Sequence, residues 1–336
     1  MIDSSKLDVV VAAIVLLAAT TACSSSDDGA AADTDATDTS ATDTNATDTS
    51  ATTPDISSSD AGEDTGSSGE AADSSTDGGP PVSGELLVLS YNIAGLPQGI
   101  SSSDPERYIP QISPLLNAYE LVLAQEDFWY HDVLLTDIEH PNLSDPSPAN
   151  PAEMGIGDGL NRFSQTPFGE LERQQWYACH GMLDCASDCL GRKGWSFARH
   201  TLADGVEVDV YNLHMEAGGC PEDIEIRTQA TLNLAAAIAE RSDGRALVVA
   251  GDFNLRATDP EDVTPLENII NGAGLTDVCD ALDCGDERID HIMVRSGTSV
   301  TLDPLMWWVP EEFVDARTGD PLSDHLPVAA RLSWSG

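Results

Sequence analysis

The sequence predicts an α/β or mixed α+β domain over residues 85–336, in which helices cover a β-sheet. Short apolar runs typical of buried strands alternate there with helical patterns, and about 250 residues suffice to bury a large core. The clearest helical pattern is 221–241, which has acidic residues in its first turn and arginine at its end. The predicted strands cover residues 86–90, 121–124, 206–213, 246–250, 289–294 and 328–332.

Residues 1–22 have the pattern of a signal peptide, and we expect the protein to be exported. An unbroken apolar run of eleven residues at 9–19 is shorter than the ~20 residues that a membrane-spanning helix needs. Cys23 follows, which resembles a bacterial lipoprotein signal whose cysteine is lipidated, at the outer membrane or cell surface. Lys6 is the one basic residue before the run, and Thr20 replaces the usual leucine, so ordinary secretion and an uncleaved anchor are alternatives.

Residues 23–84 are predicted to form a disordered acidic linker that starts at the lipidated cysteine. The segment is dominated by Ser, Thr, Asp, Ala and Gly, and residues 24–84 contain 14 acidic and no basic side chains. Such a segment has too few apolar side chains to offset the entropy lost on folding. We interpret it as a spacer between a membrane surface and a catalytic domain; the alternative is a low-complexity tail without a specific role.

The charge of the chain disfavours nucleic acid as a partner. There are 58 Asp and Glu against 15 Lys and Arg, a net charge of −43. Residues 85–336 alone carry 42 acidic and 14 basic side chains. Such a surface repels a polyanion. We also expect the protein to act as a monomer.

The cysteines support export to an oxidising compartment. Six remain when Cys23 is set aside, and they can form up to three disulfides whose pairing the sequence does not select. A zinc site is the alternative, but the spacings do not fit close Cys-x-x-Cys pairs. The six are Cys179, Cys185, Cys189, Cys220, Cys279 and Cys284.

Polar residues stand at the points where predicted strands end or begin. Any one of them could be a turn former or a solvated charge. Together they indicate one edge of a sheet, where α/β enzymes bind ligands, and they are the donor types of a metal-dependent phosphate site. The set comprises Asn92, Glu126, His214, Asp252, Asn254, Asp290, Asp324 and His325.

The motifs around these residues resemble, in order and spacing, those of the endonuclease/exonuclease/phosphatase superfamily. They are Tyr-Asn-Ile-Ala-Gly-Leu-Pro, Gln-Glu, Asn-Leu-His, Gly-Asp-Phe-Asn, Ile-Asp-His and Ser-Asp-His, within residues 86–332. The group includes deoxyribonuclease-like nucleases, inositol polyphosphate phosphatases and sphingomyelinases. The resemblance implies a deoxyribonuclease-like four-layered α/β/β/α sandwich, with the catalytic domain at 85–336.

The same resemblance implies a catalytic metal. Glu126 would be the principal ligand of Mg²⁺, with Asn92 beside it, and Asp324 would orient the site or touch the metal. Mn²⁺, Co²⁺ or Ca²⁺ are alternatives to Mg²⁺. A metal held there would act as a Lewis acid on the phosphate.

The resemblance assigns the proton chemistry to the remaining residues. Asp252 would orient or deprotonate water, while Asn254 and His214 would donate hydrogen bonds to the phosphate. His325 would be the catalytic histidine, and Asp290 would fix its tautomer and raise its basicity. His291, the next residue after Asp290, is expected to be a packed or partly solvated histidine that points away from the site.

We expect a phospholipid substrate, above all sphingomyelin, cleaved to ceramide and phosphocholine. Asn-Ile-Ala-Gly-Leu-Pro resembles the opening of neutral sphingomyelinases, and a zwitterionic head group suits an acidic domain better than DNA does. Trp307 and Trp308 lie where bacterial sphingomyelinases carry a membrane-contacting aromatic hairpin, and Trp favours the membrane interface. Otherwise this pair belongs to a strand with one ring in the core and one under a loop.

Three other functions remain open at this point. They are a secreted nuclease, a phosphatase of inositol or other small phosphates, and an inactive surface lipoprotein that binds a partner. A cysteine-containing insertion at 173–194 departs from the better known bacterial enzymes and bears on substrate choice. The complete set of polar residues argues against an inactive protein.

Overall fold

The computed structural model describes residues 82–336, apart from 149–155, 182–184, 187 and 286–287. The described residues belong to one compact unit, Gly79–Gly336. The predictions for the signal peptide, for lipidation at Cys23 and for nearly all of the linker lie outside the described residues. Within the described part, no helix combines the length and the apolar character that crossing a membrane requires.

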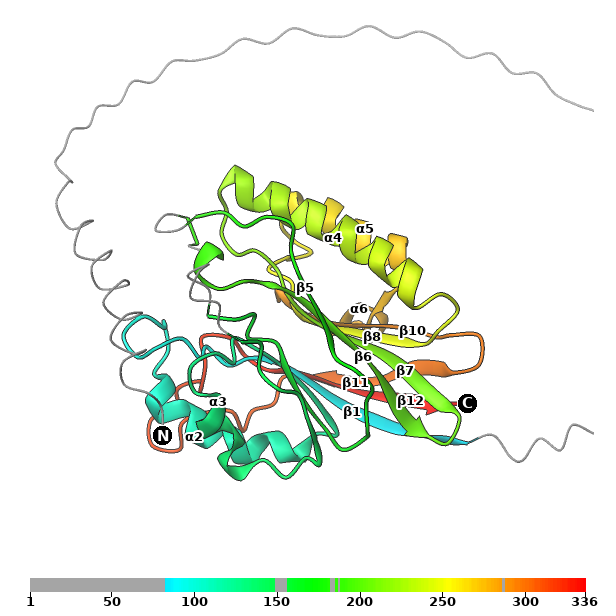
Figure 1. Cartoon of the computed structure of the whole chain (residues 1–336), viewed down its shortest axis with the longest axis horizontal. Helices are drawn as coiled ribbons and strands as arrows, with labels where there is room; N and C mark the ends of the chain where they lie inside the picture. The colour runs from blue at the N-terminus through cyan, green and yellow to red at the C-terminus, as the bar shows by residue number, and fades with distance from the viewer. Residues whose placement is uncertain (1–81, 149–155, 182–184, 187, 286–287) are drawn as a thin grey trace, which may run out of the picture. The chain divides into compact units, whose positions relative to one another are not determined.

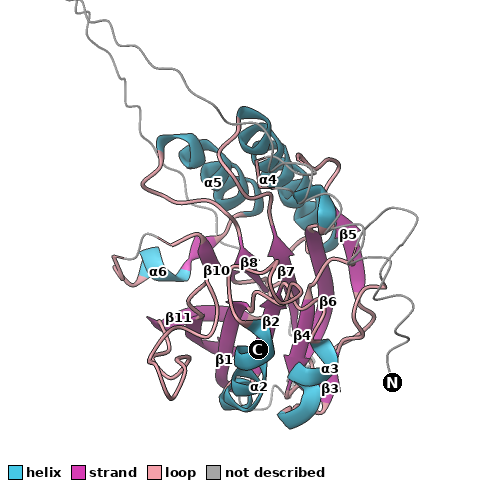
Figure 2. Ribbon diagram, turned by 90° about the vertical axis from the view of Figure 1, so that its left-hand side faces the viewer, coloured by secondary structure: helices cyan, strands magenta, loops and turns pink. Residues whose placement is uncertain are grey.

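Two six-stranded sheets pack face to face (Figure 2). The first sheet has the order β11 (Thr301–Trp308), β12 (Val328–Ser335), β1 (Ser83–Asn92), β2 (Leu121–Gln125), β4 (Asn161–Ser164), β3 (Asn142–Leu143). The second has the order β5 (Glu172–Gln175), β6 (Gly194–Ala203), β7 (Val206–His214), β8 (Leu247–Asp252), β10 (Asp290–Arg295), β9 (Thr276–Asp277).

Each sheet contains one parallel pair among its described strands, and all other neighbours are antiparallel. The parallel pairs are β1 with β2 and β7 with β8. A helix connects the strands of each pair: α2 (Pro105–Leu115) in the first sheet and α4 (Pro221–Arg241) in the second. Because parallel strands end at the same edge, each pair presents two carboxyl ends side by side.

Helices cover the outer face of each sheet, so that the domain has four layers (Figure 1). The first sheet is covered by α2 and by α3 (His131–Leu134), which are followed by the 3₁₀ turns Leu116–Ala118 and Leu135–Asp137. The second is covered by α4 and α5 (Pro260–Ala273). A further 3₁₀ turn, Asp188–Leu190, and the short helix α6 (Val278–Ala281) lie in connections. The expected α/β/β/α sandwich is confirmed.

Side-chain alternation along the strands creates three apolar clusters. In β1, Val88 faces the second sheet, whereas Leu89 faces the helices, and both are fully buried. In β7, Val208 and Val210 face the first sheet, whereas Tyr211 packs under α4 and α5. Burial of each large apolar side chain contributes roughly 1.5–3 kcal/mol. Strands with two apolar faces hold all four layers together.

All six described cysteines form disulfides, as expected for export. The pairs are Cys179–Cys189, Cys185–Cys220 and Cys279–Cys284. The second pair ties the insertion at 173–194 to the residue that precedes α4. Because each of the six sulfurs is already bonded to another sulfur, the alternative of a zinc–thiolate site has no support.

The loop before β12 should depend on one buried ring. Phe313 is 1% exposed and meets the Tyr91 ring edge-to-face at 5.1 Å between centroids. We expect Phe313→Ala to lower the free energy of unfolding by roughly 3–5 kcal/mol, because it leaves a cavity under the loop. Val314 is 39% exposed, so Val314→Ala should change the free energy of unfolding by less than about 0.5 kcal/mol. Urea denaturation of both variants measures this, and equal losses would contradict it.

Candidate active site

The strand ends of the two sheets meet at one polar site. Asn92 ends β1 and Glu126 follows β2 in the first sheet, while Asp252 ends β8 in the second. The Asn92 Nδ2 donates to Glu126 Oε1 and to Asp252 Oδ2, both at 3.1 Å. A single amide therefore joins two carboxylates from different sheets.

Asp252 lies at the centre of this site and is 1% exposed. Its Oδ2 is 3.1 Å from His214 Nε2 and 3.6 Å from His325 Nε2, in addition to the bond from Asn92. Burial alone would raise the pKa of the Asp252 carboxyl, but the two histidines outweigh burial and hold the pKa below its usual range. Asp252 is therefore an ionised acceptor surrounded by donors.

His325 is oriented by Asp290, as the motif resemblance implied. Its Nδ1 lies 2.9 Å from Asp290 Oδ2, and the register pairs Asp290 directly with Asp252. Burial lowers the pKa of His325, but Asp252 and Asp290 outweigh this effect and raise the pKa to about 10. The Ser323 Oγ donates to the Asn92 backbone oxygen at 2.7 Å and thereby ties the loop that carries His325 to β1.

Asn254 lies two residues beyond Asp252, in a left-handed conformation with φ 50°. Its backbone N–H donates to Asp252 Oδ1 at 3.0 Å, and its side-chain Nδ2 donates to the Met215 backbone oxygen at 3.0 Å. Met215 directly follows His214 at the end of β7. The segment that carries Asn254 is thus fixed to both parallel strands of the second sheet.

Two motif glycines are required by close backbone approach. A Cβ on Gly95 would lie 2.4 Å from the Glu126 backbone oxygen, and one on Gly251 would lie 2.0 Å from the Leu213 backbone oxygen. Gly251 also has φ 152°, which side chains rarely adopt. These glycines allow the chain segments that carry Glu126 and Asp252 to pack against their neighbours.

Three expected site residues are more exposed than this centre. Asp324 is exposed and accepts hydrogen bonds from Ser102 and Ser323, and its charge is among those that raise the pKa of the neighbouring His325. Trp307 and Trp308 end β11, and both rings are half-buried. The Trp307 ring packs against the core between the sheets, and the Trp308 ring packs against the helix-side core of the first sheet.

The donor set suits a hard divalent cation. Glu126, Asp252 and Asp290 supply carboxylate oxygens, which Mg²⁺, Mn²⁺ and Ca²⁺ prefer over sulfur or nitrogen. Ligand atoms of Asp252, Asp290 and His325 all lie within 4.8 Å of one another. The concentration of buried negative charge also favours a cation at this place.

Lys193 is a nearby residue that the sequence analysis did not assign to the site. It is the one lysine of residues 85–336, its side chain is 10% exposed, and it forms an ion pair with Asp188. Its charge helps to lower the pKa of Asp252. Burial, which raises this pKa, and the two histidines, which lower it, have larger effects. Lys193 belongs to the disulfide-bonded insertion at 173–194. The one signal in the sequence was that residues 85–336 contain no other lysine.

A second polar group supports the segment behind Glu126. Asp127 Oδ2 is 2.5 Å from His131 Nδ1 and accepts from Asn161 Nδ2 at 2.8 Å. All three side chains are buried. These contacts join the residue next to Glu126 to α3 and β4, which explains the placement of His131 without a role in chemistry.

Known proteins share this sequence pattern and fold. The model of the Endonuclease/Exonuclease/phosphatase family matches residues 89–325. Sphingomyelinases of Mycobacterium tuberculosis and Mycobacterium bovis are 35% identical to this chain over 274 residues, which cover 75% of this chain and 54% of theirs. The chain therefore spans about half the length of these curated relatives.

Solved structures agree with the fold. Beta toxin from Staphylococcus aureus with bound magnesium ions has a TM-score of 0.53 at 16% identity, covering 74% of this chain and 99% of that one. TDP2 of D. rerio complexed with a single-strand DNA product has a TM-score of 0.56 at 17% identity, covering 74% and 98%. Proteins with different ligands thus share the four-layered fold. Family membership therefore rests on the sequence motifs and on the family model that matches residues 89–325. This chain belongs to the endonuclease/exonuclease/phosphatase family.

Proposed function

We propose that this protein is an exported, metal-dependent phosphodiesterase that hydrolyses sphingomyelin or a closely related phospholipid. The observation that carries the proposal is a complete polar site in a chain 35% identical to the mycobacterial sphingomyelinases. An inactive binding protein would not need to keep every one of these residues in contact. The three disulfides support export to an oxidising compartment, where a lipid anchor at Cys23 would hold the enzyme near its substrate.

A divalent metal would be held by Glu126, with Asn92 beside it and Asp324 at the rim. When bound, it supplies positive charge to the non-bridging phosphate oxygens. Mg²⁺ is our first choice because the donors are oxygens and a structure with this fold contains magnesium ions.

Asp252 would orient the attacking water. Because its pKa is held low, it accepts a hydrogen bond from water readily but is a poor base for complete proton removal. Asn254 would donate its second amide hydrogen to the phosphate, and His214 would stabilise the negative charge. Correct alignment of the water with the phosphorus atom accounts for much of the rate gain in such reactions.

His325 would donate a proton to the oxygen of the leaving group. Its raised pKa keeps it protonated near neutral pH, and the ion pair with Asp290 fixes which ring nitrogen faces Asp252. Water adds to phosphorus, the bond from phosphorus to the ceramide oxygen breaks, and that oxygen takes the proton from His325. The proton that the added water loses is released to solvent, and His325 takes up a proton again before the next turnover.

The charge of the domain favours this substrate over DNA. A nuclease must attract a polyanion, and residues 85–336 have three times as many acidic as basic side chains. The phosphocholine head group of sphingomyelin has one negative and one positive charge, so it has no net charge and is not repelled in this way. A phosphatase of small phosphates shares the same chemistry, so the choice of substrate must be measured.

The proposed activity requires Glu126 and a divalent metal. Full-length protein with Mg²⁺ should release phosphocholine from sphingomyelin vesicles, should not nick plasmid DNA, and should lose activity with EDTA. Glu126→Gln keeps the shape but removes the charge, so activity should fall about 100-fold and recover partly at high Mg²⁺. Glu240→Gln on the exposed face of α4 is the control. Nicking of DNA without lipid hydrolysis would instead indicate a nuclease.

The ion pair with Asp290 should set the protonation of His325. We expect Asp290→Asn to lower the pKa of His325, because it removes one of the three carboxylates that raise it. Turnover should also fall, by roughly 10- to 100-fold, because the proton donor loses its orientation. NMR titration of the histidine ring in metal-free protein measures the first effect. An unchanged pKa would show that Asp290 does not control His325.

The end of β11 is our proposed membrane contact. It is an edge strand, and Leu305 and Met306 beside the tryptophans are 47% and 48% exposed. Replacing both by Ser should lower hydrolysis of vesicle sphingomyelin about 10-fold or more but spare a soluble chromogenic phosphodiester, because apolar insertion is lost. Leu232→Ser, at a 45% exposed position on α4, is the control. Equal loss on both substrates would reject this contact.

A further inference from the structure

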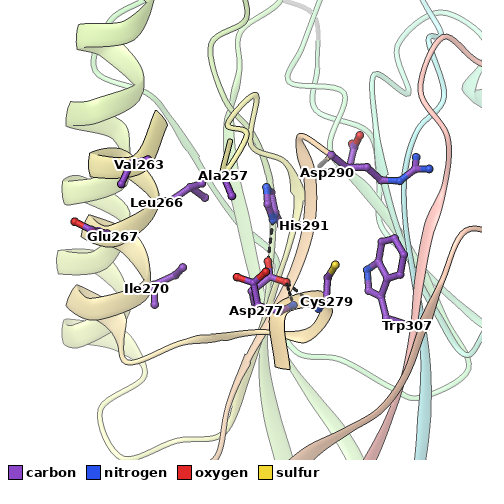
Figure 3. A pocket seen from close by; sticks show the side chains of 12 residues that line it. Ala257, Val263, Leu266, Glu267, Ile270, Asp277, Cys279, Asp290, His291 and Trp307 are labelled. Carbon is purple, nitrogen blue, oxygen red and sulfur yellow. Dashed lines mark hydrogen bonds and ion pairs between the residues drawn. The ribbon is translucent and has the colours of Figure 1, made fainter. Parts of the chain in front are cut away.

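His291 lies next to Asp290 but on the other face of β10. Strand alternation directs Asp290 toward His325 and directs His291 toward α6. Figure 3 shows the His291 ring and the Asp277 carboxylate pointing toward each other. The expected packed histidine is thus observed, but its contacts indicate more than packing.

Both ring nitrogens of His291 meet acceptors. The Nδ1 lies 2.8 Å from Asp277 Oδ2, and the Nε2 lies 2.9 Å from the Leu255 backbone oxygen. Neither a carboxylate nor a carbonyl oxygen can donate, so both nitrogens must carry hydrogen. In agreement, burial lowers the pKa of His291, but Asp277 outweighs burial and raises it above the usual value. The ring is mostly covered, with 12% of the side chain exposed, and it makes two hydrogen bonds.

Asp277 is itself held in place. Its Oδ1 accepts from the backbone N–H of Cys279 at 2.8 Å and from that of Asp280 at 3.3 Å, which caps α6. The Cys279–Cys284 disulfide cross-links this short helix to the residues that follow it. His291 is therefore anchored on one side to a cross-linked structure outside the site.

On its other side, His291 contacts the segment that carries Asn254. Its Nε2 donates to the backbone oxygen of Leu255, the residue that follows Asn254. The Phe253 ring packs edge-to-face on the His291 ring with 5.2 Å between centroids. Asn254 has a left-handed backbone, which asparagine adopts more readily than other non-glycine residues, and the contacts around it select this conformation. The Asn254 side chain donates a hydrogen bond to the Met215 backbone oxygen, and His291 donates one to the Leu255 backbone oxygen.

We propose that His291 is a positioning residue for the reaction, which fixes Asn254 toward the phosphate through its hydrogen bond to Leu255. The expected effect on the reaction rate rests on the proposed function. The structural link from His291 to Asn254 is independent of it. His291 itself does not touch the reacting atoms; it acts through the segment 253–255.

The experiment replaces His291 by Phe, which keeps a ring but removes both donors. The ring borders a cavity of about 170 Å³ that is also lined by Leu266, Ile270 and Trp307, so a slightly larger ring has room (Figure 3). We expect kcat to fall roughly 10- to 100-fold while KM changes little, because Asn254 is misplaced rather than lost. His291→Gln keeps one N–H donor and should recover part of the rate.

A double-mutant cycle separates positioning from a general structural effect. If His291 acts through Asn254, then adding His291→Phe to Asn254→Ala should lower kcat no further than Asn254→Ala alone does. His140→Phe is the matched control, because His140 is also buried and its Nε2 lies 2.8 Å from the Tyr119 backbone oxygen. It should leave kcat unchanged. Additive losses, or equal losses from the control, would overturn the proposal.

Hydrogen exchange tests the structural link without any substrate. The Asn254 amide is bonded to Asp252 Oδ1, so its exchange should accelerate in His291→Phe while that of Val249 in the middle of β8 stays unchanged. Unchanged exchange at Asn254 would overturn the proposal. If instead the wild type fails to cleave sphingomyelin but exchange at Asn254 does accelerate, the proposed substrate is wrong and the positioning role stands.

Discussion

The amide of Asn92, shared between the carboxylates of Glu126 and Asp252, is the interaction on which the site depends. The two carboxylates come from different sheets and would repel each other if nothing lay between them. Burial makes each charge costly unless it is met by donors, and Asp252 has four of them within reach. The sheets can therefore meet at this edge only with the amide and both histidines in place.

Backbone strain is concentrated at the same edge. Ala94, Glu126 and Asn254 all have φ between 50° and 55°, in the left-handed region. Each such residue costs on the order of 1–3 kcal/mol and persists because its surroundings hold it. Here the surroundings are the ends of buried strands, with glycines that permit close packing. Among the described residues, Cys185 and Asp283 are the other non-glycine residues with positive φ, and both lie in disulfide-bonded connections.

The sequence predicts the layers because each buried strand is a short apolar run, and it predicts the central polar residues because they follow those runs. The predicted strands did not include β3, β4, β5 and β9, which are two to four residues long. They also lacked β6 and β11, whose apolar residues are mixed with His, Arg, Asp and Pro; for β11, a strand was only the alternative for the Trp pair. The contribution of Lys193 could not be foreseen, because the Cys179–Cys189 and Cys185–Cys220 bridges determine where its loop folds back. Likewise, no local pattern connects His291 with Leu255, since their contact depends on how a loop returns to its strand.

The position of β12 has a consequence for how the protein reaches its folded state. This strand lies between β1 and β11, and its register pairs Ser335 with Ser83. The first sheet is therefore split until β12 has been synthesised, and the edge of β1 that pairs with β12 remains open until then. A chain with this topology emerges from the ribosome with its first sheet incomplete. Such a delay would suit the export proposed above, because translocation requires an extended chain.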